Sequence, residues 1–163
     1  MACMAAYEEQ IAGQRFISAS APLRVEFAKA RLSAQIDGSD DWCIVWTPEI
    51  HLDGDVVVPD LAGWRTKRMP PPDALVIEVI PDWVCEILTM TTERYDRGTK
   101  LPFYARCHIE DMWYINPIAR SLELWRPYRD HPAIVGGYEE SEIFRAEHFD
   151  SVDIELGALW LEE

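Results

Sequence analysis

The sequence predicts an α/β (α+β) protein, in which a mixed β-sheet is flanked by helices. Helix-forming residues with apolar side chains near helical spacing fill residues 21–36, where a proline opens the segment. Three β-branched or apolar runs follow, and a second helical segment separates them from two or more further strands. This order is not a regular βαβ repeat, so the sheet is expected to be mixed and not purely parallel.

The expected strands are apolar stretches bounded by turn residues. They are residues 42–52, 55–64, at least the second half of 75–88, 111–117, 121–128, 142–147 and 152–156. The segments 111–117 and 121–128 are expected to form a hairpin. A proline-rich loop is expected over 67–74, and a threonine opens the second helix within 91–107. Pro102 should kink or interrupt that helix, because proline lacks the N–H that an internal turn needs.

Length and composition predict one globular domain over residues 1–163. The chain is 48% hydrophobic and contains seven tryptophans, so it can bury a substantial core. The first sixteen residues lack the basic and apolar regions of a signal peptide, and no window resembles a membrane helix. The four cysteines are far apart and include no CxxC pair. These features predict a cytoplasmic protein with reduced thiols and no membrane partner.

The net charge of −14 opposes tight binding to nucleic acid. It is uneven, because residues 139–163 hold nine acids and one base and therefore carry −8. Two basic groups follow the second and third apolar runs. They are Arg65, Lys67 and Arg68, and then Arg94, Arg97, Lys100 and Arg106. Each group is either a solvated face or part of a track for phosphates.

Two acids interrupt these apolar runs. Asp60 follows the valines and proline of "VVVPD", and Glu86 stands between Cys85 and Ile87. Charged side chains are rarely buried unless they are paired or bind a metal. If the two strands are neighbours, both carboxylates can converge on one cation, with the carbonyl of Ile87 as a third protein ligand. Oxygen ligands of this kind suit Mg²⁺.

Both acids also have simpler interpretations. An aspartate after a proline at a strand end can cap a turn, and a glutamate in an apolar strand can pair with an arginine. From the spacing alone, these structural roles and the metal site remain alternatives.

Several motifs resemble one bacterial family. "VVVPDLAGW", "DWVCEIL", "DRGTKLPFYA" and "MWYINPIARSLELWR", in this order and spacing, are similar to the Uma2 family of the PD-(D/E)xK nuclease superfamily. The resemblance runs from about Glu49 to Trp160. It implies a restriction-endonuclease-like mixed sheet flanked by helices, and a Mg²⁺- or Mn²⁺-dependent endonuclease acting on DNA. Superfamily members often pair to cut two strands, so a homodimer is expected by analogy only.

The resemblance also implies site residues. The superfamily aspartate maps to Asp60 and its glutamate to Glu86, both expected as catalytic residues and metal ligands. The lysine that usually follows two positions after the glutamate is replaced by Leu88, and the family lysine maps to Lys100 in the next helix.

Lys100 can also be interpreted from its spacing. Asp96, Lys100 and Tyr104 are four residues apart, so a regular helix would place them on one face. Lys100 would then either form an ordinary helical ion pair, or orient the attacking water and neutralise the scissile phosphate. The roles of Asp96, Tyr104 and Glu26 stay open; Glu26 is either an additional acid of the site or a surface residue.

The sequence departs from the family pattern at two places. "TMTT" stands where the family has Ser-Pro-Ser-Thr, and no histidine follows the proline before the first helix. These departures and the acidic charge favour an alternative, a catalytically inactive nuclease-fold module for binding or assembly. A small-molecule hydrolase that uses the same acids is a third alternative.

Overall fold

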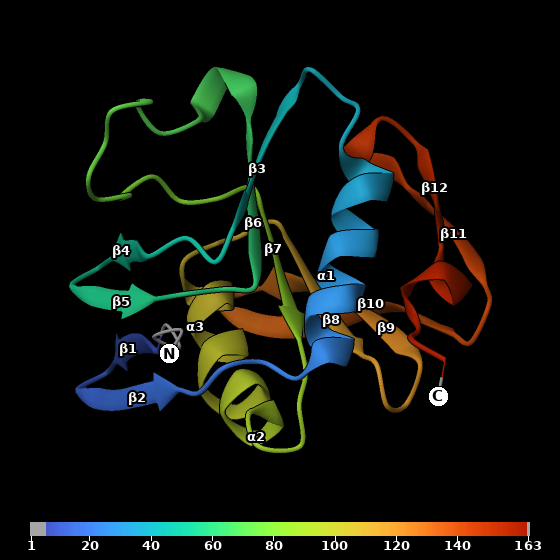
Figure 1. Ribbon diagram of the computed structural model, residues 1–163. Coiled ribbons are helices and arrows are strands. Elements are labelled where there is room, and N and C mark those ends of the chain that lie inside the picture. Colours follow the sequence, from blue (N-terminus) through green and yellow to red (C-terminus); the bar gives the residue numbers. More distant parts are fainter. Residues whose placement is uncertain (1–5, 163) are drawn as a thin grey trace, which may run out of the picture.

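The central feature of the computed structural model, which describes residues 6–162, is a six-stranded mixed sheet (Figure 1). Its strands have the order β10-β9-β8-β7-β6-β3. They are β3 (Trp42–Trp46), β6 (Leu61–Arg65), β7 (Trp83–Ile87), β8 (Asp111–Asn116), β9 (Ser121–Tyr128) and β10 (His131–Glu139). Only β7 and β8 run parallel, while the other neighbours are antiparallel. The predicted mixed sheet with flanking helices is therefore confirmed.

The other strands form a smaller sheet and a hairpin. The smaller sheet has the order β2-β1-β5-β4, with β1 (Tyr7–Ile11), β2 (Gln14–Ser18), β4 (Ile50–Leu52) and β5 (Asp55–Val57). The hairpin pairs β11 (Ile143–Ala146) with β12 (Val152–Glu155). The helical segments are α1 (Leu23–Ile36), η1 (Thr66–Arg68), α2 (Glu93–Tyr95), η2 (Asp96–Lys100), α3 (Leu101–Arg106), η3 (Glu147–Phe149) and η4 (Leu156–Leu159).

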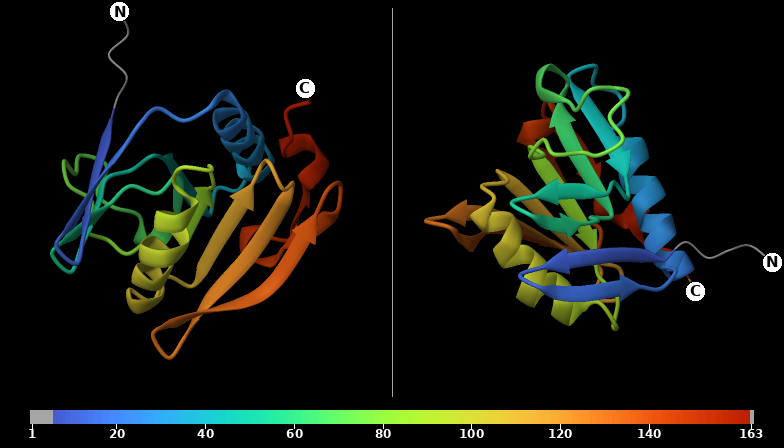
Figure 2. Two further views of the ribbon diagram at one scale, coloured as in Figure 1. Left: turned by 90° about the horizontal axis from the view of Figure 1, so that it is seen from below. Right: turned by 90° about the vertical axis from the view of Figure 1, so that its left-hand side faces the viewer.

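The central sheet has a hydrophobic core on each face. One core joins the sheet to α1, the β11–β12 hairpin and η4, and the other joins it to α3 and the smaller sheet (Figure 2). The alternation of side chains along β7 separates the two: Trp83, Cys85 and Ile87 belong to the first core, and Val84 to the second. Glu86 therefore points to the face that α3 covers.

Two predicted strands are each divided in the structure. Residues 42–52 form β3 and β4, and residues 55–64 form β5 and β6, with the members of each pair in different sheets. Thr47 has a left-handed φ of 45° between β3 and β4. Pro59 has no N–H to give to a ladder, so β5 ends before it and the chain crosses to the central sheet. Asp60 stands at this crossover, directly before β6.

Two features were not predicted. The first is the β1–β2 hairpin, whose turn residues Ala12 and Gly13 both have positive φ, as in a type I′ turn. The second is β10, an edge strand with a register shift between Ile134 and Gly136. The other expected elements are present: the first helix, the buried strand β7, the β8–β9 hairpin and the strands β11 and β12.

The second helix is interrupted as its proline predicts. The segment η2 is a π-helical turn, and the N–H of Leu101 bonds to the carbonyl of Asp96, five residues back. Pro102 opens α3 immediately afterwards. Because Pro102 has no N–H, an α-helical ladder cannot continue through this point, and the wider turn accommodates the break.

Two sequence expectations about cysteines and membranes can be compared with the structure. Cys43, Cys85 and Cys107 are free thiols, while Cys3 lies outside the described residues. Across residues 6–162, no helix has both the length and the apolar character needed to span a membrane.

The first core predicts a strong dependence on Phe149. Its fully buried ring packs against Trp42, Trp83 and Trp113, with centroid distances of 4.5, 5.1 and 5.4 Å. Phe149→Ala should lower the free energy of unfolding in urea by about 3–5 kcal/mol, because a large buried ring is lost. The control Ile143→Ala, at a side chain that is 60% exposed, should cost about 1 kcal/mol or less. Equal losses for the two variants would contradict this packing.

Candidate active site

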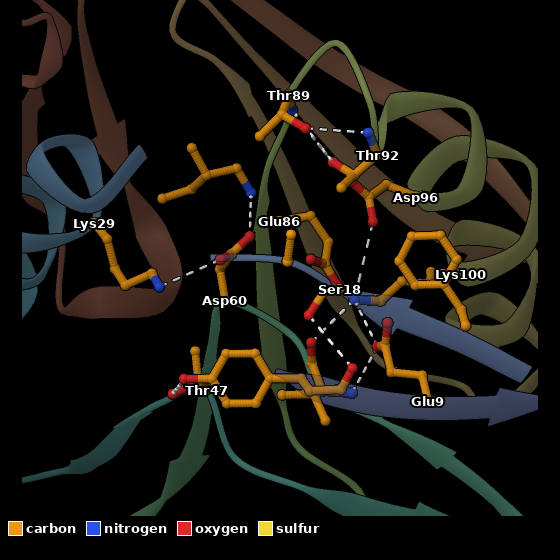
Figure 3. A pocket seen from close by; sticks show the side chains of 15 residues that line it. Glu9, Ser18, Lys29, Thr47, Asp60, Glu86, Thr89, Thr92, Asp96 and Lys100 are labelled. Carbon is orange, nitrogen blue, oxygen red and sulfur yellow. Dashed lines mark hydrogen bonds and ion pairs between the residues drawn. The ribbon is translucent and has the colours of Figure 1, made fainter. Parts of the chain in front are cut away.

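A small cavity of about 70 Å³ lies where β6 begins and β7 ends (Figure 3). Both sheets, α1 and η2 contribute to its walls. Its charged lining consists of four carboxylates and two lysines: Glu9, Asp60, Glu86, Asp96, Lys29 and Lys100. The structure therefore brings together all three residues expected to be catalytic, Asp60, Glu86 and Lys100, in one cavity. It adds two that the sequence did not indicate, Glu9 and Lys29.

Asp60 both caps a strand and faces the cavity. The ladder between β6 and β7 ends at the pair Leu61–Cys85. The N–H of Ile87 then donates to Oδ2 of Asp60 at 2.8 Å, while Oδ1 lies 3.3 Å from Nζ of Lys29. The side chain of Asp60 thus accepts from the neighbouring strand β7, and not from a turn of its own segment as the structural alternative supposed. This bond fixes the orientation of a carboxylate that also lines the cavity.

Glu86 is buried and paired with a lysine. Only 2% of the residue is exposed, and its Oε1 accepts from Nζ of Lys100 at 2.6 Å and from the hydroxyl of Tyr104. Burial raises the pKa of Glu86 well above its usual value. Lys100 opposes this rise, and Asp96 is the first of the nearby carboxylates that add to it. The partner proposed for Glu86 from its burial alone was an arginine; the observed partner is Lys100.

Lys100 is surrounded by acceptors. Its Nζ lies 2.6 Å from Oε1 of Glu86, 2.9 Å from Oε1 of Glu9 and 3.1 Å from the carbonyl oxygen of Val58. Burial alone would lower the pKa of Lys100, but Glu86 and Glu9 outweigh burial and raise it, so the ammonium stays charged. Asp96 lies 4.0 Å away on the preceding turn.

The expected shared helical face is present. Lys100 and Tyr104 both reach Oε1 of Glu86, and Asp96 lines the same cavity. The hydroxyl of Tyr114 donates to the backbone carbonyl of Asp96 at 2.9 Å, which ties the π-helical turn to β8.

Glu9 enters the site from the β1–β2 hairpin. Its Oε1 accepts from the backbone N–H of Val58 at 2.7 Å as well as from Lys100. The hairpin is held further by Phe16, which stacks on Tyr95 with ring centroids 3.9 Å apart. A sequence signal exists: in "YEEQIAGQ" a two-residue turn follows Ile11, so period-2 alternation places Glu9 and Ile11 on one face.

Lys29 enters from α1. Its Nζ lies 3.0 Å from Oε1 of Glu26 and 3.3 Å from Oδ1 of Asp60, and only 2% of the residue is exposed. Burial lowers its pKa, but Asp60 and Glu26 outweigh burial and leave the pKa raised. The sequence signal is a lysine on an apolar helical stripe with Val25, Leu32 and Ile36. Glu26 itself contacts Lys29 but does not line the cavity.

The charged lining of the cavity offers oxygen donors to a divalent cation. Four carboxylates and two ammonium groups leave a formal charge of −2. Oε2 of Glu86 has no hydrogen-bond or ion-pair partner within residues 6–162. The N–H and C=O of one strand residue point to the same side, so the carbonyl of Ile87 faces the side of Asp60. No three His, Cys, Asp or Glu side chains of the described residues form a metal cluster. Mg²⁺ is commonly held by one or two carboxylates with water and substrate oxygens.

The basic groups of the sequence lie mostly outside this cavity. Of the seven residues in the two groups, only Lys100 lines it. Arg68 pairs with Asp82, and Arg97 pairs with Glu93 and Glu123. These pairs favour the interpretation of both groups as structural or solvated faces.

A mixed sheet flanked by helices, with clustered acids at the ends of two adjacent strands, defines a restriction-endonuclease-like protein. The model of the Uma2 family, described as "Putative restriction endonuclease", matches residues 6–162, and the chain belongs to this family. The resemblance of the sequence motifs to the Uma2 family is therefore confirmed.

A solved structure has the same fold. It is the crystal structure of a "putative nuclease belonging to DUF820" from Anabaena variabilis, with a TM-score of 0.78 and 14% sequence identity. The similarity covers 94% of this chain and 89% of that chain. A search of curated proteins gave no match.

The surroundings of Asp96 predict a pH-dependent stability. Burial raises its pKa from 3.8 to about 6, although Lys100 and a hydrogen bond from Thr92 oppose the rise. The pKa of Asp96 is higher in the folded than in the unfolded protein, so the folded protein is most stable below the unfolded pKa. Its free energy of unfolding falls as the pH rises from about 4 to 6. At pH 7 Asp96→Asn should remove a penalty of up to about 3 kcal/mol. Urea unfolding of both proteins at pH 4 and pH 7 tests this: the gain should disappear at pH 4. A difference independent of pH would exclude this origin.

Proposed function

We propose that the protein is a metal-dependent endonuclease that hydrolyses phosphodiester bonds in DNA. Membership of the Uma2 family supports the class of enzyme. The observation that carries the proposal is the meeting of Asp60 and Glu86 in one cavity of formal charge −2, beside buried Lys100. A divalent cation would offset the excess negative charge of this cavity. Such a cation assists the hydrolysis of phosphodiesters.

The residues of this chain prepare the site in three ways. Asp60, Glu86 and the carbonyl of Ile87 would hold Mg²⁺ or Mn²⁺. When bound, such an ion lowers the pKa of a bound water and stabilises negative charge on phosphate oxygens. The N–H of Ile87 orients Asp60, and Lys100 and Tyr104 orient Glu86, so both carboxylates are fixed before the ion arrives.

A binding or assembly module without activity is the second candidate. Two observations favour it: the ammonium of Lys100 is fully occupied by protein acceptors, and the net charge is −14. A lysine with no proton left for the substrate cannot neutralise a phosphate directly. The homodimer and the cytoplasmic location stay predictions from the sequence.

The test is nicking of supercoiled plasmid with Mg²⁺, Mn²⁺ or EDTA. Wild type should nick in metal and not in EDTA. Glu86→Gln should lower the rate by about 10²–10³-fold, the usual cost of losing one preorganised electrostatic contact. Glu123→Gln is the matched control, because Glu123 is also ion-paired on a central strand but lies outside the cavity. It should keep the wild-type rate.

Metal binding has its own measurement. Mn²⁺ at about 100 times its dissociation constant should stabilise wild type by about 2.7 kcal/mol. That corresponds to a rise of roughly 5–10 °C in melting temperature for a domain of this size. Glu86→Gln should lose this rise. Stabilisation by Mn²⁺ without any nicking would favour the binding module. If wild type shows no stabilisation by Mn²⁺ and no nicking, the nuclease proposal is refuted.

A further inference from the structure

The two buried lysines of the cavity differ in how many of their protons already have acceptors. A lysine ammonium carries three N–H donors and no acceptor. Lys100 has three acceptors within 3.1 Å: Oε1 of Glu86, Oε1 of Glu9 and the carbonyl oxygen of Val58. Every proton of Lys100 is therefore matched inside the protein.

Lys29 has only two acceptors. They are Oε1 of Glu26 at 3.0 Å and Oδ1 of Asp60 at 3.3 Å, and residues 6–162 provide no third acceptor for its Nζ. The side chain is nevertheless 97% buried and lines the cavity next to Asp60 (Figure 3). A buried ammonium with one unmatched proton is suited to an anion that enters from the cavity.

We infer, on the basis of the proposed function, that Lys29 contacts the scissile phosphate of DNA, whereas Lys100 is a positioning residue that holds Glu86. Lys29 can donate its third proton to a phosphate oxygen while its contacts with Asp60 and Glu26 remain. Lys100 could reach a phosphate only by leaving Glu86 or Glu9, which would strand a buried carboxylate without its cation.

The partners of the two lysines support this division. Glu86 and Glu9 are nearly fully buried, so water cannot replace Lys100. The side chain of Glu26 is 47% exposed, so this partner of Lys29 is itself hydrated and does not depend on Lys29 for its only contact.

The experiment measures the salt dependence of DNA binding. Fluorescence anisotropy of a short labelled duplex in Ca²⁺ gives the association constant at several salt concentrations. Loss of one phosphate contact reduces the slope of log K against log salt by about 0.9. Lys29→Met should show this reduction and bind about tenfold more weakly, and Lys29→Arg should restore most of the slope. Arg31→Met, at an exposed cation on the same helix outside the cavity, should leave the slope unchanged.

Lysine-labelled NMR of wild type provides the opposite comparison, because it needs no change at Lys100. Added duplex should shift the Lys29 signal more than that of Lys100. The same measurement replaces the slope if Lys29→Met fails to fold. An unchanged slope in folded Lys29→Met, a larger shift at Lys100, or no binding of the duplex by wild type would overturn the inference.

Failure of the proposed function looks different. Wild type that binds the duplex with a Lys29-dependent slope, but never nicks plasmid in Mg²⁺ or Mn²⁺, would refute the nuclease activity. In that case the assignment of Lys29 as the phosphate contact would still be supported.

Discussion

The ammonium of Lys100 is the interaction on which the rest of the site depends. It connects Glu9 of the β1–β2 hairpin, the carbonyl of Val58 at the crossover between the sheets, and Glu86 of the central sheet. Burying a charge is costly unless good geometry and further hydrogen bonds compensate it. Here one lysine satisfies two buried carboxylates and one carbonyl. It therefore connects two sheets and a helix at the cavity.

The carboxylates of the site could be predicted because they violate a pattern. Asp60 and Glu86 interrupt apolar runs, and a charge in such a place needs a partner or an ion. Lys100 came from the resemblance together with its spacing from Asp96. Glu9 and Lys29 were not predicted, because the sequence around each also contains exposed polar or charged residues. Glu9 stands among exposed polar residues, and Lys29 belongs to a helix that also carries Glu26 and Arg31 on its solvent side. Only the tertiary contacts distinguish the buried charges from the exposed ones.

The fold was predictable where local pattern and final packing agree. The buried strand β7 and the β8–β9 hairpin have continuous apolar stretches and clear turns. Residues 55–64 were misread because the three valines suggest continuity, while Pro59 moves the chain from one sheet to another. β10 contains Pro132 and the adjacent Gly136 and Gly137, residues that are poor strand formers. It is a strand because β9 offers it an edge, and a single sequence does not reveal that edge.

The position of Glu9 has a consequence for how the protein folds. Its contact with Val58 spans 49 positions in the chain, and its partner Lys100 lies farther still. Contacts of such long range require a large loop to close, so they tend to form slowly. During synthesis the hairpin leaves the ribosome long before Lys100 does, so the contact between Glu9 and Lys100 can form only afterwards. The acidic cavity is therefore expected to close late, after the local hairpins and helices have formed. Until then Glu86 and Lys100 remain hydrated, and their pKa values shift only in the last steps of folding.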